Sequence, residues 1–146
     1  MHFKLQPGGA LNGDVRVPGD KSISHRAIML GALAEGTSRV NGFLEGEDAL
    51  ATLAAFRAMG VAIEGPQDGL VTVHGVGLRG LKAPVSALDL GNAGTGMRLL
   101  CGLLAGQAFD TELTGDVSLC SRPMGRVIEP LTRMGASIQS AEGGRP

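Results

Sequence analysis

The sequence contains no tryptophan or tyrosine and only four phenylalanines among its 146 residues. This shortage leaves little aromatic surface for stacking on nucleic-acid bases. Thirteen basic residues stand against 14 acidic ones, so the chain also lacks the charge excess that would hold nucleic acid or an anionic membrane. No apolar run approaches the ~20 residues needed to cross a bilayer, and the first residues have no apolar core of signal-peptide length. These absences favour a soluble cytoplasmic protein that binds neither nucleic acid nor membrane.

Residues that bind metals or form disulfides are also scarce. Cys101 and Cys120 are the only cysteines, and two isolated thiols are typical of a reduced chain, with a single disulfide as the alternative. The three histidines, at positions 2, 25 and 74, lie far apart and have no companions at metal-ligand spacing. We therefore expect no metal site, and we expect His25 to be solvated or to cap a helix.

Glycine, in contrast, is abundant. The chain has 24 glycines, which is about twice the usual ~7%, and they lie between periodic segments, which predicts tight connections among short elements. The patterns predict strands at Gly13–Pro18 and Ser38–Leu44, helices at Ser22–Glu35 and Glu47–Met59, and a hairpin of Val61–Glu64 with Leu70–His74. On the first helix, the predicted apolar face consists of Ile23, Ala27, Leu30 and Ala34. The fold class is therefore mixed α/β.

An internal repeat divides the chain. Five residues of the second helix and the strand after it recur 75 positions later, namely Leu53, Phe56, Met59, Gly60 and Ile63 as Ile128, Leu131, Met134, Gly135 and Ile138. Arg26 is matched by Arg98 at an offset of 72. We predict leading strands in 1–18, one α/β unit in 19–83 and a second, incomplete unit in 84–146. Residues 136–140 would then be a strand without its hairpin partner, an edge that proteins usually cover, so we expect the chain to be part of a longer protein.

The first of three basic clusters is PGDKSISHR, Pro18–Arg26. Asp20 or Ser22 is a suitable N-cap, and Lys21, Ser22 and Arg26 lie within about one helical turn. The unpaired N–H groups of a helix N-terminus, together with lysine and arginine, suit an anion. A capped helix with solvated basic side chains explains the stretch equally well when it is taken alone.

The second cluster is LGNAGTGMR, Leu90–Arg98. Its glycines and Asn92 allow close approach of the backbone, Thr95 is a possible cap, and Arg98 is expected on the first helical turn. Because this cluster occupies the repeat position of the first, two equivalent helix starts can face one anionic ligand.

The third cluster is SLCSRPMGR, Ser118–Arg126. We expect Ser121 to cap a helix whose first turn contains Pro123, with Arg122 and Arg126 on one face; a solvated basic face is the alternative. Cys120 is expected to be a small buried residue rather than a nucleophile. The carboxylates form no catalytic pair, although Asp48 is a possible partner of the basic clusters.

These three motifs, in this order, resemble the 5-enolpyruvylshikimate-3-phosphate synthase family. The resemblance covers essentially the whole chain but only about the first third of the family's usual length. It implies transfer of the enolpyruvyl group of phosphoenolpyruvate to the 5-hydroxyl of shikimate 3-phosphate, in the pathway to aromatic amino acids, with no metal or organic cofactor. It also implies a monomeric enzyme of two domains, each an inside-out α/β barrel of three βαβαββ units.

The resemblance assigns roles to individual residues. Shikimate 3-phosphate is expected to contact Lys21, Ser22 and Arg26, and phosphoenolpyruvate is expected to contact Lys21, Gly94 and Arg122. Lys21 would contribute electrostatically to catalysis, and Asn92, Thr95 and Arg98 would support the site. The acid–base residues are expected beyond Pro146, so we expect the isolated chain to be inactive. Leu99 replaces a proline that many members have, and Gly94 is expected to leave room for the inhibitor glyphosate.

Two alternatives remain open. The related transferase that acts on UDP-N-acetylglucosamine in cell-wall synthesis shares the fold and the donor, but its first motif has asparagine after the lysine. Ser22 and the short spacing from Cys120 to Arg122 favour the shikimate branch. The other alternative is a non-catalytic phosphate-binding fragment.

Overall fold

The computed structural model describes residues 2–146 and has the mixed α/β fold that the sequence predicts. Its helices are α1 (Lys21–Leu33), α2 (Glu47–Ala58), α3 (Gly94–Leu104), α4 (Val117–Cys120) and α5 (Gly125–Arg133). Its strands are β1 (Glu35–Val40), β2 (Ala62–Gln67), β3 (Leu70–Val76), β4 (Leu88–Asp89) and β5 (Leu113–Thr114). None of the helices in the described residues has the length and apolar character required for crossing a membrane.

The first part of the fold is a three-stranded antiparallel sheet in the order β1-β3-β2. The register of β1 on β3 runs from Glu35 opposite Val76 to Val40 opposite Val71. The predicted hairpin of β2 and β3 is confirmed, and its turn contains Asp68 and Gly69, with φ of 52° and 72°. Positive φ at two consecutive residues is the geometry for which Asp-Gly turns are selected.

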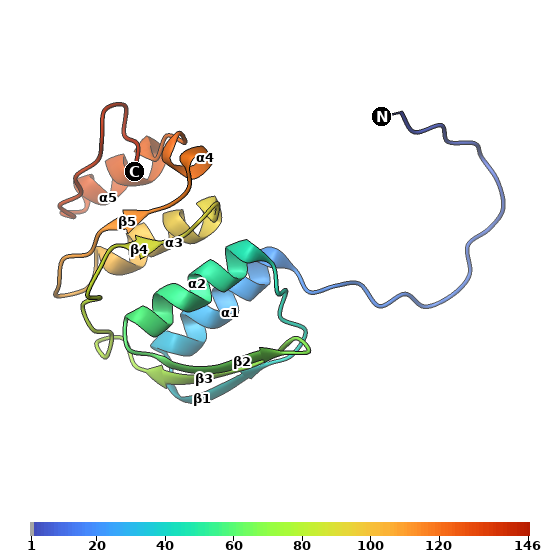
Figure 1. The fold of residues 1–146 in the computed structure, drawn as a ribbon, viewed down its shortest axis with the longest axis horizontal. Helices are drawn as coiled ribbons and strands as arrows, with labels where there is room; N and C mark the ends of the chain where they lie inside the picture. Colours follow the sequence, from blue (N-terminus) through green and yellow to red (C-terminus); the bar gives the residue numbers. More distant parts are fainter. Residues whose placement is uncertain (1) are drawn as a thin grey trace.

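Helices α1 and α2 cover one face of this sheet (Figure 1). Val71 and Val73 are two residues apart on β3, so both side chains point to the same face of the sheet. Both are fully buried, as are Ile28 of α1 and Phe56 of α2. The predicted apolar face of α1 is wrong, because Ile23 and Leu30 are 68% and 67% exposed. The helix instead buries the stripe that contains Ser24, His25, Ile28, Met29 and Ala32.

Two polar residues on this stripe are tolerated because they are hydrogen-bonded. The Ser24 hydroxyl donates to the Asp20 carbonyl at 2.8 Å and accepts from the Leu44 amide at 2.9 Å. The Nδ1 atom of His25 bonds with the Thr52 hydroxyl at 2.7 Å. These pairings offset the cost of burying polar groups, and they attach α1 to the loop before α2 and to α2 itself.

The second part of the fold consists of α3, α4 and α5 around the short parallel pair of β4 and β5. Leu90, Met97, Leu100 and Leu119 are fully or almost fully buried there. Helix α2 contacts both α3 and β4, so the two parts share one continuous core. This contact places the start of α3 beside the helices of the first part.

Three predicted strands differ from the structure. Residues 2–20 form neither helix nor strand, and apolar side chains there, such as Val15 and Val17, are exposed. Residues 136–140 also form no strand, and the strand predicted at Ser38–Leu44 is found at Glu35–Val40. A strand needs a neighbour for its N–H and C=O groups; β1 has one in β3, whereas the other two segments have none among the described residues.

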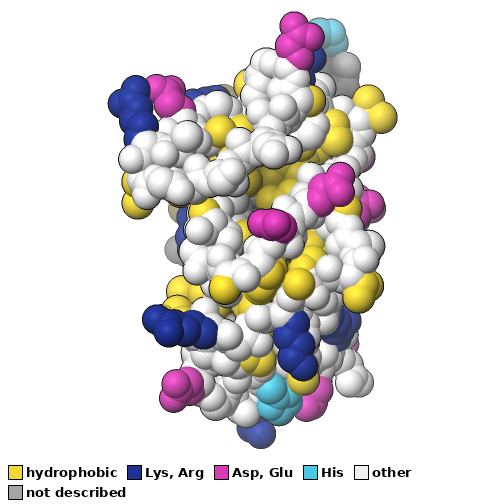
Figure 2. All heavy atoms as spheres, turned by 90° about the vertical axis from the view of Figure 1, so that its left-hand side faces the viewer, with side chains coloured by type: hydrophobic (Ala, Val, Ile, Leu, Met, Phe, Trp, Pro, Cys, Tyr) yellow, Lys and Arg dark blue, Asp and Glu magenta, His cyan; other side chains and the backbone are white. Residues whose placement is uncertain are grey.

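A groove of about 1050 Å³, lined by both apolar and polar side chains, lies between α3, α5 and the C-terminal residues. Figure 2 shows hydrophobic side chains gathered in a hollow on the side of the molecule that faces left in Figure 1. The sequence repeat pairs α5 with α2. Helix α2 has several buried residues, whereas α5 has none. Gly60 and Gly135, however, follow α2 and α5 with φ of 88° and 101°, as expected of matching helix ends. The duplication itself stays a prediction.

Candidate functional site

The start of α1 carries the first basic cluster. The Asp20 carboxylate caps the helix by accepting from the Ile23 amide at 2.7 Å, which confirms one of the two predicted caps. Lys21, Ser22 and Arg26 are all exposed on this end of the helix. Arg26 folds back along the helix, and its Nη1 atom donates to the Ser22 carbonyl at 3.0 Å. The cluster is therefore open to solvent and already has its arginine ordered.

Asp48, on the first turn of α2, holds the lysine of this cluster. Its carboxylate forms an ion pair with Lys21, whose side chain is half exposed whereas that of Asp48 is 19% exposed. The possible partnership between Asp48 and the basic clusters is confirmed. The pair joins the N-terminal turns of α1 and α2, where both helix dipoles favour a negative charge.

The second basic cluster surrounds the start of α3. Arg98 donates from Nη1 to the Gly94 carbonyl at 3.2 Å, which matches the contact of Arg26 with the Ser22 carbonyl on α1. Thr95 does not cap the helix: α3 begins at Gly94, its N-cap is Ala93, and no side chain caps it. Asn92 precedes the N-cap, and its side-chain oxygen accepts from Arg122 instead of capping the helix.

Gly94 lies against two guanidinium groups. A Cβ atom added to Gly94 would lie 2.7 Å from Nη1 of Arg122 and 3.2 Å from Nη1 of Arg98. Glycine is therefore the residue that lets both arginines approach the first turn of α3. The structure thus brings together four predicted site residues, Asn92, Gly94, Arg98 and Arg122.

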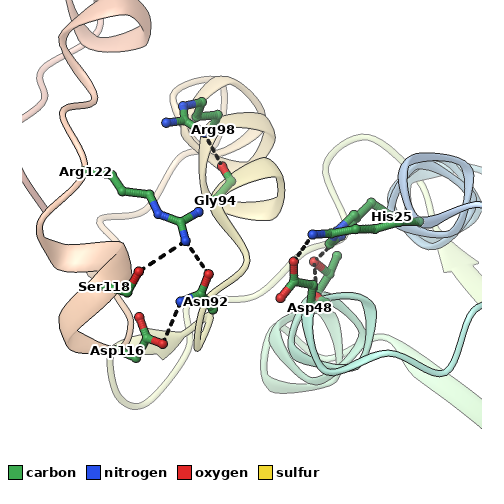
Figure 3. A network of polar contacts seen from close by, with 10 residues as sticks. His25, Asp48, Asn92, Gly94, Arg98, Asp116, Ser118 and Arg122 are labelled. Atoms are coloured by element: carbon green, nitrogen blue, oxygen red, sulfur yellow. Dashed lines mark hydrogen bonds and ion pairs between the residues drawn. The ribbon is translucent and has the colours of Figure 1, made fainter. Parts of the chain in front are cut away.

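Arg122 is held by a network of polar contacts (Figure 3). Its Nη2 atom donates to the Asn92 side-chain oxygen in a short contact and to the Ser118 hydroxyl at 3.3 Å. The Asn92 Nδ2 atom donates in turn to the Asp116 carboxylate at 2.8 Å. Asp116 and Ser118, which belong to the segment that forms α4, were not among the predicted site residues.

The local structure predicted for the third cluster is wrong. Ser121 ends α4 rather than starting a helix, and Pro123 precedes α5, which begins at Gly125. The N-cap of α4 is Asp116, whose carboxylate accepts from the Leu119 amide at 2.7 Å. Arg122 therefore lies between the two helices and not on one helical face with Arg126, which is exposed on α5. Among the described residues, Arg126 forms no hydrogen bond or ion pair with the side chains around Gly94.

His25 lies beneath the site and is not solvated, contrary to expectation. Its side chain is fully buried, and burial is the main cause that lowers its pKa, with Asp48 opposing and Lys21 adding to the shift. The Nε2 atom has no hydrogen-bond partner. A Cβ added to Gly96 would lie 2.7 Å from the Thr52 hydroxyl and 3.6 Å from the His25 ring. Contacts among His25, Thr52 and Gly96 thus join α1, α2 and α3 in the core, next to the first and second basic clusters.

The titratable groups of the site are an ionised carboxylate and thiols without the features of an activated nucleophile. The hydrogen bond from Asn92 is the main cause that lowers the pKa of Asp116, which keeps this carboxylate ionised. Burial raises the pKa of the Cys101 thiol, and Cys120 donates from its sulfur to the Gly115 carbonyl at 3.3 Å. Both cysteines are free thiols. Among residues 2–146, no cluster of three potential metal ligands occurs.

The geometry can be compared with known proteins. The profile of the family described as EPSP synthase (3-phosphoshikimate 1-carboxyvinyltransferase) matches residues 5–146. The chain belongs to the EPSP synthase family. A 3-phosphoshikimate 1-carboxyvinyltransferase of Alkalilimnicola ehrlichii is 73% identical over 144 residues, which are 99% of this chain and 32% of the relative. That of Hydrogenovibrio crunogenus is 65% identical over 146 residues, 100% of this chain and 33% of the relative.

Solved structures of the family agree with the fold. The EPSP synthase of Acinetobacter baumannii superposes with a TM-score of 0.89 at 65% identity, covering 92% of this chain and 30% of that one. The chain therefore spans about a third of the length of the relatives that it matches.

Proposed function

We propose that the complete protein transfers the enolpyruvyl group of phosphoenolpyruvate to the 5-hydroxyl of shikimate 3-phosphate, releasing phosphate. In this proposal the chain supplies part of the substrate-binding surface, and the matched relatives carry the name of this activity. The single observation that carries the proposal is the convergence of Arg98 and Arg122 on Gly94 at the start of α3, in the same pattern as Arg26 on α1. Both substrates are anions, and such cationic helix starts suit them.

The first basic cluster, at the start of α1, would bind shikimate 3-phosphate. Lys21, Ser22 and Arg26 offer an ammonium, a hydroxyl and a guanidinium from one exposed helix end, and all three donate to phosphate oxygens. Arg26 is ordered by its bond to the Ser22 carbonyl, so less side-chain entropy is lost when it binds. Asp48 holds Lys21, which keeps the ammonium in place before the substrate arrives.

Gly94 and Arg122, at the start of α3, would bind phosphoenolpyruvate. The Arg122 guanidinium has several donors in a planar fork that matches carboxylate or phosphate oxygens, and the missing side chain of Gly94 lets this guanidinium approach the start of α3. Lys21 would contact this substrate as well as the first. Asn92 would orient Arg122, while Thr95 and Arg98 would support the same helix start.

The contribution of these residues to catalysis would be electrostatic. Cations arranged before the reaction stabilise the charge that develops on the departing phosphate, and Lys21 would do so from the α1 side. The proton transfers need an acid and a base that we assign to no residue of this chain. We therefore propose that the isolated chain binds substrate without turning it over. We also propose that the chain is divided into two units, 19–83 and 84–146. The complete protein would be a monomer located in the cytoplasm.

The experiment that tests this function uses a chimera in which this chain replaces the matching third of the Alkalilimnicola relative. We expect phosphate release that requires both shikimate 3-phosphate and phosphoenolpyruvate. Arg122→Ala and Lys21→Ala should each lower kcat/KM by about 10- to 100-fold, the range for hydrogen bonds to charged groups. Arg39→Ala, an exposed arginine on β1, is the matched control and should leave kcat/KM unchanged.

Two outcomes would reject the proposal. A chimera that uses UDP-N-acetylglucosamine in place of shikimate 3-phosphate would assign the chain to the cell-wall branch. Equal losses in Arg39→Ala and Arg122→Ala would mean that the basic cluster has no special role. When shikimate 3-phosphate is added to the isolated chain, we expect NMR shifts at Lys21, Ser22 and Arg26. Measurable phosphate release by the isolated chain would contradict its proposed inactivity.

A further inference from the structure

Asp116 uses its two carboxylate oxygens for two different contacts. The Oδ1 atom accepts from the Leu119 amide at 2.7 Å and caps α4. The Oδ2 atom accepts from Nδ2 of Asn92 at 2.8 Å, and the side-chain oxygen of Asn92 accepts from Arg122. A carboxylate, an amide and a guanidinium are thus connected in series (Figure 3), and the cap alone does not explain the second contact.

The series has a direction because an amide side chain donates at one end and accepts at the other. An ionised carboxylate only accepts, so Asp116 requires the NH₂ end of Asn92 to face α4. The oxygen of Asn92 must then face Arg122, whose guanidinium only donates. If Asn92 turned by 180°, two donors would meet at Arg122 and two acceptors at Asp116.

The backbone holds the two ends of this series at a fixed separation. The Asp116 amide donates to the Gly91 carbonyl at 2.9 Å. A Cβ on Gly115 would lie only 2.5 Å from the same carbonyl oxygen, so glycine permits this close approach. The loop before α3 and the turn before α4 are therefore locked together at the point where Asn92 reaches Asp116.

We propose that Asp116 is a positioning residue: it fixes the orientation of the Asn92 amide and thereby holds the Arg122 guanidinium beside Gly94. In the reaction proposed above, on which this role rests, Arg122 then meets the anionic donor substrate in its binding orientation. The lowered pKa of Asp116, caused mainly by the bond from Asn92, accords with a carboxylate that stays ionised and accepting.

The variant Asp116→Asn separates this role from capping. Asparagine caps helices about as well as aspartate, so α4 is retained through the Leu119 amide. Its NH₂ group would then face the NH₂ group of Asn92, and the series would break. The variant also removes a negative charge near Arg122, which by itself would strengthen binding of an anion. A capping role thus predicts an unchanged or lower KM for phosphoenolpyruvate, whereas positioning predicts a higher one.

The double variant Asn92→Asp with Asp116→Asn tests the direction of the series. The asparagine introduced by Asp116→Asn would cap α4 with its oxygen and donate its NH₂ to the carboxylate introduced by Asn92→Asp, which would accept from Arg122. The net charge equals that of the original chain, and every donor again meets an acceptor. We expect this exchange to restore the Arg122 orientation that the single variant loses.

One measurement is independent of the enzymatic proposal. In NMR spectra of the 146-residue chain, a bonded Arg122 should give a guanidinium resonance with slowed rotation, and the Asn92 side-chain amide should shift as Asp116 is protonated. Asp116→Asn should abolish the slowed rotation, and the double variant should restore it. A slowed guanidinium that persists in Asp116→Asn, or that the double variant fails to restore, would overturn the proposal.

The kinetic measurement uses the chimera. Asp116→Asn should raise the KM for phosphoenolpyruvate about tenfold, the loss expected for one hydrogen bond to a charged group, while kcat and the KM for shikimate 3-phosphate stay nearly unchanged. An unchanged or lower KM for phosphoenolpyruvate leaves Asp116 as a cap only and overturns the proposal. If the chimera carrying the original residues transfers no enolpyruvyl group, the proposed function fails, and the NMR result still decides whether Asp116 orients Arg122.

Discussion

Replacing Gly96 with alanine tests how closely α3 must approach α1 and α2. The added Cβ would lie 2.7 Å from the Thr52 hydroxyl oxygen, a distance that real Cβ atoms essentially never show. Thr52 is fully buried and its hydroxyl is bonded to Nδ1 of His25 at 2.7 Å. His25 is also fully buried, so we expect the substitution to shift α3 or to break the bond between Thr52 and His25.

The magnitude follows from three opposing contributions. An extra methyl group in a packed core costs about 1–3 kcal/mol, and loss of the His25–Thr52 hydrogen bond adds about 1 kcal/mol. Alanine in place of glycine within a helix returns about 1 kcal/mol. We therefore expect Gly96→Ala to lower the free energy of unfolding by about 1–3 kcal/mol. Gly102, in the same helix, is exposed and has nothing within 4 Å of an added Cβ, so Gly102→Ala should raise it by about 0.5–1 kcal/mol.

The assay is urea denaturation of the chain and the two variants. The stability differences should appear as shifts of the urea midpoint in opposite directions, with the slope of the transition unchanged. Because both variants make the same chemical change in one helix, helix propensity cancels from their comparison. Equal stabilities of Gly96→Ala and Gly102→Ala would refute the close contact between α3 and the Thr52–His25 pair.

Three further outcomes are expected. In the chimera, Gly94→Ala should weaken inhibition by glyphosate, because its Cβ would lie 2.7 Å from Nη1 of Arg122; an unchanged inhibition constant would count against this. The pKa of His25 is lowered by burial, so the folded chain binds fewer protons than the unfolded one, and stability should fall as pH drops below about 6.5. His25→Phe should flatten that dependence between about pH 7 and 5, as measured by urea midpoints; an unaltered slope would assign it to other groups. Burial raises the pKa of the Cys101 thiol, so iodoacetamide should alkylate it more slowly at about pH 8 than it alkylates a free cysteine, with mass spectrometry as the readout and equal rates as the contrary result.

Features that depend on neighbouring residues were predictable from the sequence. The Asp20 cap needs only the amide three residues ahead, and the hairpin turn needs only Asp68 and Gly69 at positive φ. The recurrence of Arg26 at Arg98 also has a local basis, since each arginine donates to the carbonyl four residues before it. Local chemistry of this kind leaves its pattern in the sequence because the partners are a fixed number of residues apart.

Features that depend on distant partners were not predictable in the same way. Apolar residues occur on both sides of α1, and the core covers the side with His25 instead of the side with Ile23. Burial of His25 becomes acceptable only through Thr52, 27 residues away. Asp116 before a short helix is a recognisable cap signal, but its second bond reaches Asn92, 24 residues earlier. No spacing in the sequence marks such a contact.

The arrangement of charge follows from the need to hold cations close together without a ligand. Arg98 and Arg122 both approach Gly94, and like charges so close together repel. Asp116, linked to Arg122 through Asn92, offsets part of this repulsion, and Asp48 pairs in the same way with Lys21 of the first basic cluster. The two clusters are joined below by the uncharged contacts of His25, Thr52 and Gly96. Charge is therefore balanced locally, and a chain with a net charge of −1 can gather several cations at one place without a general excess of positive charge.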